Sequence, residues 1–208
     1  MEDVLEVYQR PLSDTNPLVC IDETSKQHVK ETRQGMAVAP SHGERYDYEY
    51  ERNGVSNIFM MFDPLKGWRH AKVTDRRTQV DWAQCMKELA DNHFPEAQKI
   101  TIVMDNLNTH KPASFYEAFP PAEARRLIDR FEFHYTPKHG SWLDMAEIEL
   151  GVLQRQCLNR RLPDQKTLRR EVKAWEKQRN SKKAKVNWRF TTKDARIKLK
   201  RLYPSIQS

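Results

Sequence analysis

The chain has 208 residues, of which 38% are hydrophobic and 31% are charged, and its net charge is +7. This length allows one well-buried domain with a short appendage, and the composition excludes a disordered chain. No apolar run approaches the roughly 20 residues that span a bilayer, and the acidic N-terminus lacks the layout of a signal peptide. Three cysteines, Cys20, Cys85 and Cys157, lie far apart in apolar settings. They favour reduced core thiols in a cytosolic protein over a disulfide framework.

The charge is unevenly distributed along the chain. Residues 151–208 contain 18 Lys and Arg against four Asp and Glu and carry +14, whereas residues 1–150 carry −7. A basic tail joined to an acidic body suits a polyanionic partner, because each cation that neutralises a phosphate releases a counterion. A solvated helical surface explains the same charge equally well.

The first part of the chain predicts antiparallel strands. Leu18–Asp22 is apolar and then abruptly acidic, as in a short buried strand, and Arg45–Arg52 alternates tyrosines with charges. Asn53-Gly54 predicts a hairpin turn. The strands Ile58–Phe62 and Trp68–Val73 follow.

Helices and strands then alternate. Thr78 and Asp81 predict a capping box that opens a helix. Lys99–Asp105 is a second buried strand that ends in Asp, a helix is expected over Ala122–Arg130, and residues 131–135 alternate as a strand.

The remaining segments predict helices. A second capping box at Ser141 and Asp144 would open a helix to about Leu158, and Pro163 suits the first turn of the next helix. A last short helix would carry Ala195, Leu199 and Leu202. This order predicts an α/β fold in which a mixed sheet has helices on both faces. Residues 1–16 would form a lead-in, 17–160 the core, and 161–208 a basic helical extension packed on it.

Asp22 and Asp105 share one feature, since each ends a predicted apolar strand. Ligands of α/β sheets tend to bind beyond the strand C-termini, so two such carboxylates on neighbouring strands would converge. A divalent cation relieves their repulsion and uses both as oxygen ligands. Capping of the next turn is the alternative role for each residue.

The helix after residue 141 offers a third acid among Asp144, Glu147 and Glu149. On a helical wheel Glu147 and Glu149 flank the apolar stripe about equally, so periodicity does not choose between them. Gly151, one turn beyond Glu147, leaves space on that side and favours Glu147 weakly. Asp144 is explained by the capping box, and Glu149 is then expected on the surface.

Three strings, CIDET (20–24), MDNLNTH (104–110) and YTPKHGSWLDMAEIEL (135–150), resemble the signature blocks of DDE transposases. The insertion sequence 630 branch of the mariner-related superfamily is the most similar, and the resemblance extends from about Pro17 to Pro204. By this resemblance the triad is Asp22, Asp105 and Glu147. Asp144 stands where such blocks often have Asn.

The resemblance implies a ribonuclease H-like fold and a metal-dependent reaction that cuts and joins DNA. The triad would hold two Mg²⁺ ions, for which Mn²⁺ substitutes, about 3.5–4 Å apart. The partners would be transposon ends and target DNA, bound by a homodimer in the bacterial cytoplasm. Members usually carry helix-turn-helix modules before the catalytic domain, so this chain would be one part of a split or truncated transposase. A nuclease or resolvase without strand transfer, or a non-catalytic DNA-binding remnant, are the alternatives.

Weaker candidates surround the triad. Some could orient a ligand or contact DNA, with turn formation or solvation as the alternative. Trp142 is expected as a core anchor. The candidate DNA-contacting residues are Asn106, Asn108, His110, His139, Lys182, Lys183 and Lys185.

Overall fold

The computed structural model describes residues 1–31, 50–107, 110–138 and 140–202. Its strands are β1 (Leu18–Glu31), β2 (Tyr50–Asp63), β3 (Trp68–Thr74), β4 (Ile100–Met104) and β5 (Phe131–Tyr135). Its α-helices are α1 (Glu2–Val7), α2 (Gln79–Glu88), α3 (Ser114–Ala118), α4 (Pro121–Asp129), α5 (Met145–Leu153), α6 (Gln165–Ser181) and α7 (Thr192–Lys198). Two π-helical turns, η1 (Leu89–His93) and η3 (Gln154–Leu158), extend α2 and α5, and two 3₁₀ turns, η2 (Ser141–Leu143) and η4 (Lys200–Leu202), complete the set.

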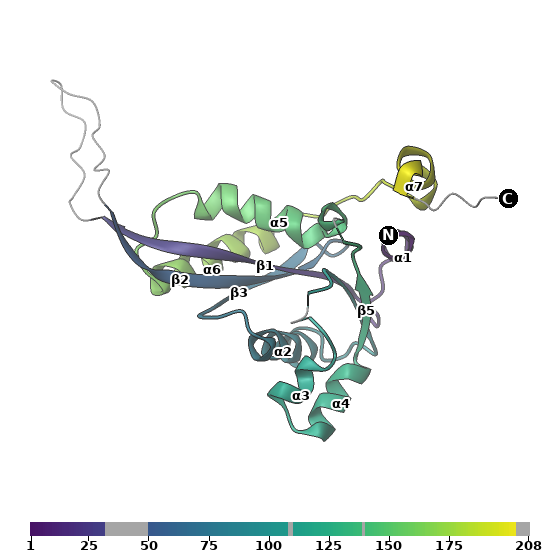
Figure 1. Cartoon of the computed structure of the whole chain (residues 1–208), viewed down its shortest axis with the longest axis horizontal. Coiled ribbons are helices and arrows are strands. Elements are labelled where there is room, and N and C mark those ends of the chain that lie inside the picture. Colours follow the sequence, from purple (N-terminus) through teal and green to yellow (C-terminus); the bar gives the residue numbers. More distant parts are fainter. Residues whose placement is uncertain (32–49, 108–109, 139, 203–208) are drawn as a thin grey trace.

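The five strands form one mixed sheet in the order β3-β2-β1-β4-β5. The strand β1 pairs antiparallel with β2, and β2 with β3, whereas β4 runs parallel to both β1 and β5. Helices α5 and α6 lie on one face, and α2, α3 and α4 lie on the other (Figure 1). The predicted α/β class, with helices on both faces of a mixed sheet, is confirmed.

The sheet separates two apolar cores. Successive residues of the β2 run Ile58–Phe62 point to alternate faces, so Met60 packs toward α5 and α6 while Phe59 and Met61 pack toward α2. A strand covered on both faces needs apolar residues at every position, which explains the unbroken run.

The longest strands differ from their predictions. The strand β1 does not end at Asp22 but continues to Glu31. The hairpin turn predicted at Asn53-Gly54 is wrong, because both residues lie within β2 at a β-bulge. Gly54 has φ 90°, the left-handed conformation that a turn or a bulge of this kind requires. Most of the predicted strand Arg45–Arg52 falls outside the described residues, and its last three residues belong to β2.

Helix starts follow local capping, with two corrections. The predicted box at Thr78 and Asp81 is present at the start of α2. The box predicted at Ser141 is wrong, because Asp144 is itself the N-cap of α5 and accepts a hydrogen bond from the amide of Ala146. The predicted first-turn position of Pro163 is also wrong, because Asp164 caps α6 and Pro163 lies one residue before that cap.

Two short helices have no counterpart in the sequence prediction. In α1, Val4, Leu5 and Val7 are buried in the core beneath α5 and α6. Tyr8, which follows α1, donates a hydrogen bond from its hydroxyl to the carbonyl of Leu143 at 2.5 Å. The first residues therefore support the turn that leads into α5. The other such helix is α3, five residues long.

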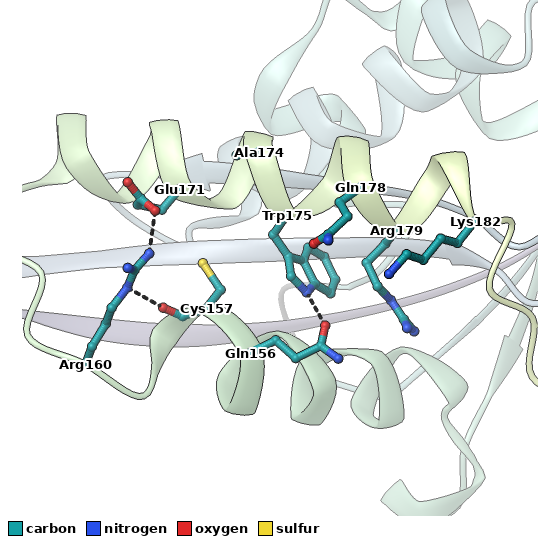
Figure 2. A pocket seen from close by; sticks show the side chains of 9 residues that line it. All are labelled: Gln156, Cys157, Arg160, Glu171, Ala174, Trp175, Gln178, Arg179 and Lys182. Atoms are coloured by element: carbon teal, nitrogen blue, oxygen red, sulfur yellow. Dashed lines mark hydrogen bonds and ion pairs between the residues drawn. The ribbon is translucent and has the colours of Figure 1, made fainter.

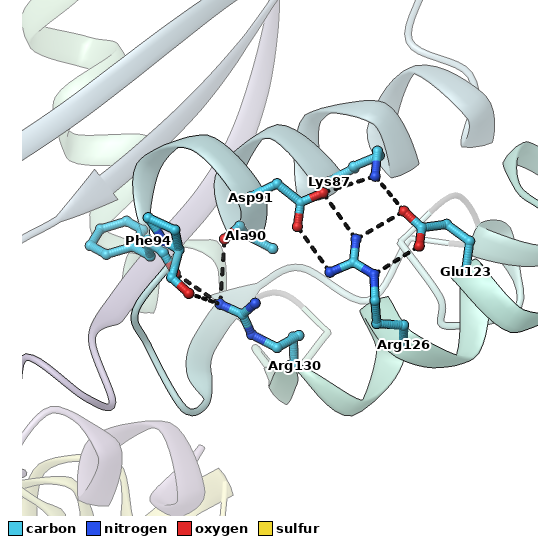
Figure 3. A network of polar contacts seen from close by, with 8 residues as sticks. Lys87, Ala90, Asp91, Phe94, Glu123, Arg126 and Arg130 are labelled. Carbon is cyan, nitrogen blue, oxygen red and sulfur yellow. Dashed lines mark hydrogen bonds and ion pairs between the residues drawn. The ribbon is translucent and has the colours of Figure 1, made fainter.

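A charged network joins the end of α2 to α4 (Figure 3). Lys87 contacts Asp91 at 2.8 Å and also Glu123, and Arg126 binds both of these acids. Each ion pair is partly exposed and contributes little to stability alone. Because the pairs share partners, together they hold the end of α2 and η1 against α4. Among the described residues, no helix is both long and apolar enough to cross a membrane.

Candidate active site

Asp22 lies in the middle of the sheet, on the face that α5 covers. It pairs with Met60, which pairs with Ala71, and both of these neighbours belong to the core beneath α5 and α6. Its carboxylate accepts one hydrogen bond at 2.8 Å, from the amide of Glu23. The apolar run before Asp22 places it beside the core, and the parity of the strand points it toward α5.

Asp105 follows the last residue of β4, as predicted, and is held by a buried histidine. His110 contacts Asp105 Oδ1 through Nδ1 at 2.6 Å, and Glu23 Oε2 through Nε2 at 3.1 Å. Burial lowers the pKa of His110, but the hydrogen bonds to Asp105 and Glu23 outweigh burial and raise it to about 9. A protonated His110 donates to Asp105 and forms an ion pair with Glu23, so it holds the Asp105 carboxylate in one orientation.

Helix α5 brings Asp144 and Glu147 to the same place. Asp144 is buried at the N-cap, where Oδ1 accepts from the amide of Ala146 and Oδ2 has no hydrogen-bond partner. Glu147 lies one turn later and is exposed. An acid in the first turn of a helix is favoured by the helix dipole, which helps to hold Glu147 there as an anion.

The raised pKa values of Asp22 and Asp144 show that the charges of these acids interact. Burial raises the pKa of Asp22 to about 7, and the charges of Glu23, Asp105 and Glu147 add to the effect. Burial also raises the pKa of Asp144 well above its usual value, and the charge of Asp22 contributes next. Within the described parts of the chain, Asp22, Asp144 and Glu147 have no Lys, Arg or His partner. Such a cluster fits a divalent cation, which would supply the missing positive charge.

The oxygens of Asp22, Asp105 and Glu147 do not all lie within 4.8 Å of one another. Uncompensated carboxylates repel, and bound cations would draw them closer. The charges of Asp105 and Glu147 nevertheless act on Asp22, because both help to raise its pKa.

Glu149 is placed quite differently from the prediction of a surface position. Its side chain is 1% exposed and lies 3.0 Å from Nε of Arg69, which is fully buried. Arg179 of α6 binds the same carboxylate through two bonds of 2.9 and 2.8 Å. Two guanidinium groups therefore neutralise Glu149 inside the fold, and this acid ties α5 to β3 and α6.

The weaker candidates divide into three groups. Asn106 lines an open pocket of about 430 Å³ beside Asp105, together with Lys138 and Ser141, and is accessible to a ligand. His110 is only 1% exposed and contacts Asp105, so of its two predicted roles the structure favours orientation of Asp105 over contact with DNA. Asn108 and His139 lie outside the described residues.

Residues near the C-terminal end of α6 remain exposed, including Lys182, Lys183 and Lys185. Trp142 is 44% exposed and stacks against Trp188, so the prediction of a core anchor is wrong.

A larger pocket lies elsewhere. It measures about 680 Å³ and opens between η3 and α6, where Trp175 donates a hydrogen bond to Gln156 (Figure 2). Its lining includes no acid of the triad. Pocket size therefore does not identify the candidate site, whereas the smaller pocket is lined by Asp105 itself.

Comparisons with known proteins identify the family and the fold. A family model described as DDE superfamily endonuclease matches residues 17–169, and the chain belongs to this family. The fold resembles the Mos1 transposase paired-end complex with left transposon end, with a TM-score of 0.57 at 12% identity over 88% of this chain and 56% of that one. It also resembles the Mos1 strand transfer complex, with a TM-score of 0.55 at 14% identity over 87% of this chain and 57% of that one.

The sheet is thus of the ribonuclease H-like type, and the chain spans little more than half the length of these structures. A comparison with curated proteins finds no match.

Proposed function

We propose that this chain is the catalytic domain of a DDE transposase of the insertion sequence 630 type, which cleaves DNA at transposon ends and joins the freed 3′-hydroxyl to target DNA. Membership of the DDE superfamily endonucleases supports cleavage of DNA. The observation that carries the proposal is the cluster formed by Asp22, Asp105 and Glu147, in which only Asp105 has a cationic partner, His110, while the charges of Asp22 and Glu147 are unmatched.

Asp22, Asp105 and Glu147 would hold two Mg²⁺ ions, or Mn²⁺ in their place. When bound, such ions activate water and neutralise charge on the attacking and leaving oxygens of an in-line displacement. Solved neighbours include the Mos1 mariner paired-end complex with Mn and the corresponding complex with Mg, which supports the choice of metals.

Neighbouring residues of the chain orient the acids of this centre. His110 fixes Asp105 through Oδ1, and Glu23 holds the other side of the imidazole. The amide of Glu23 orients Asp22. The pocket beside Asp105 would receive the scissile strand, where Asn106 can contact a phosphate or sugar. Because the cleavage is a direct displacement, it requires no covalent protein intermediate.

The partners follow from the same proposal. Transposon ends and target DNA would bind across this face, and a homodimer would pair two ends in a bacterial cytoplasm. The positive charge of residues 151–208 supports contact with phosphates.

The test is nicking and strand transfer of supercoiled plasmid DNA in Mg²⁺ and in Mn²⁺. Asp22→Asn, Asp105→Asn and Glu147→Gln should each lower nicking by more than about 100-fold, since metal ions contribute several kcal/mol to the transition state. Glu117→Gln removes an exposed charge from α3 and should retain activity.

The outcomes separate the candidate functions. Joined products support a transposase, whereas cleavage without joining supports a nuclease or resolvase. If the unaltered chain binds DNA but does not cleave it in the presence of metal, it is a DNA-binding remnant and the proposal is overturned.

A further inference from the structure

A second group of metal-binding side chains lies at the free edge of the sheet, on the face opposite Asp22. His70 of β3, Glu88 at the end of α2 and His93 at the end of η1 each offer one ligand atom, and these atoms all lie within 4.8 Å of one another. Among the residues that the structure describes, they are the only such group of three. His70 pairs with Met61, which belongs to the core beneath α2.

The distances fit a tetrahedral ion. His70 Nε2 lies 3.5 Å and His93 Nε2 lies 3.9 Å from Glu88 Oε1. In a tetrahedral zinc site with ligand bonds of about 2.0–2.2 Å, neighbouring ligand atoms are about 3.3–3.6 Å apart. A shift of a few tenths of an ångström would bring both contacts with Glu88 into this range, and the ligand atoms of the two histidines lie within 4.8 Å of each other.

A local change in the helix makes this arrangement possible. In a regular α-helix, two residues five positions apart point about 140° away from each other. The π-helical turn η1, closed by the bond from the amide of Phe94 to the carbonyl of Leu89, returns His93 to the side of Glu88. Single π turns within α-helices are often found at functional sites.

The surroundings resemble the outer shell of a metal centre. Glu176 of α6 lies 3.3 Å from His70 Nδ1, so Nε2 is the nitrogen directed toward Glu88. The same carboxylate accepts a bond from the amide of Ala71 on the edge strand. His93 Nε2 is buried without a hydrogen-bond partner, and Trp68 packs against its ring at 5.0 Å.

The geometry points to a zinc-binding site formed by His70, Glu88 and His93, with a fourth position open to water. Two nitrogens and one carboxylate are a ligand set of zinc and related transition metals, whereas Mg²⁺ prefers oxygen ligands. The three side chains are 20–28% exposed, so an ion can reach them. Bound zinc would attach β3 to the end of α2 and so secure the free edge of the sheet. Without metal, Glu88 contacts Lys72, and His70 contacts Glu176.

The test uses the full chain after removal of metals with a chelator. Zn²⁺ is titrated by calorimetry and Co²⁺ by visible absorption, in about 5 mM Mg²⁺ to fill the oxygen-rich centre. We expect one tight Zn²⁺ per chain, intense Co²⁺ bands of tetrahedral type, and a higher melting temperature with Zn²⁺. His93→Gln should weaken Zn²⁺ binding by more than about 100-fold, and Glu176→Gln by about 10–100-fold, the usual effect of an outer-shell partner.

Controls identify the site. His134→Gln removes a histidine that also contacts two carboxylates, Asp3 and Glu132, and should leave Zn²⁺ binding unchanged. Glu147→Gln should also leave it unchanged. If His93→Gln does not fold, His70→Gln is tested with the same expected effect. Failure of the unaltered chain to bind Zn²⁺, or equal binding by the His93 and His134 variants, would overturn the site.

Discussion

Two acids on the same helix meet opposite electrostatic surroundings. Glu149 lies between the guanidinium groups of Arg69 and Arg179, and its charge is matched inside the fold. Glu147, two residues earlier, is exposed, and its charge helps to raise the pKa of Asp22 and of Asp144. None of these three acids has a Lys, Arg or His partner among the described residues. One helix therefore supplies a structural acid on one side and an unmatched acid on the other.

The difference shows how a buried acid can be assigned a role. A carboxylate whose charge is matched by fixed cations can be removed only at the expense of stability. A cluster without such cations destabilises the fold and persists where an external cation completes it. The comparison supports the proposal that the cluster around Asp22 binds a ligand, whereas Glu149 holds the fold together.

The largest expected effect is on stability. Glu149→Gln leaves Arg69 buried without its charged partner and should lower the free energy of unfolding by about 3–5 kcal/mol. Glu147→Gln, at an exposed position, should change it by less than about 0.5 kcal/mol. Urea unfolding followed by circular dichroism measures both variants without metal. Similar decreases in the two variants would remove the distinction between matched and unmatched acids.

The second effect concerns His110, which supplies a cationic partner to Asp105 beside the unmatched acids. His110→Gln removes the charged group that orients Asp105, so affinity for Mn²⁺ should fall by about 10–100-fold. Calorimetry measures the affinity, and the melting temperature checks the fold. His134→Gln, on β5, serves as the matched control. If both variants bind Mn²⁺ alike, His110 supports only the fold.

Much of this site can be predicted from local sequence. Asp105 ends an apolar strand and Asp22 follows an apolar run, so the pattern alone indicates both, and resemblance then selects Glu147. Asp22 lies on the face that α5 covers, but β1 continues past it, so the argument from a strand end does not hold for this residue. The bulge at Gly54 escapes prediction because Asn-Gly has the same left-handed preference in a bulge as in a hairpin turn.

The role of Glu149 cannot be predicted in the same way. Arg69 and Arg179 lie 80 and 30 residues from it in the sequence, and only tertiary packing brings them together. One local signal is present, since Arg69 occupies an alternate position of β3 that faces the core. The group of His70, Glu88 and His93 cannot be predicted from the sequence either. In a regular helix the side chains of Glu88 and His93 would point in different directions, and nothing local predicts the π turn.

A third effect is the pH dependence of metal binding. Because the raised pKa of Asp22 is about 7, its carboxyl is mostly protonated below that pH in the metal-free protein, and a cation must displace the proton. Affinity for Mn²⁺ should therefore rise about tenfold per pH unit up to about pH 7 and then level off. Calorimetry at about pH 5.5, 6.5 and 7.5 measures this slope, and Asp22→Asn should bind weakly with a smaller slope. Equal affinity at the two lower pH values would show that Asp22 is already ionised there.

The smallest expected effect concerns surface cations that would neutralise DNA phosphates, as Arg179 neutralises Glu149 inside the fold. Lys182, Lys183 and Lys185 are exposed, so they are free to neutralise DNA phosphates. Replacing all three with Gln should reduce the slope of log affinity against log salt by about 0.9 for each phosphate that is no longer neutralised, without changing base preference. Filter binding to two unrelated duplexes at about 50–200 mM salt measures both properties. The matched comparison is Lys182→Gln/Lys185→Gln against Lys99→Gln/Arg125→Gln, since each pair lowers the net charge by two at exposed positions. If the two pairs reduce the slope equally, general charge and not this cluster attracts the DNA, and the cations that match its phosphates lie elsewhere on the chain.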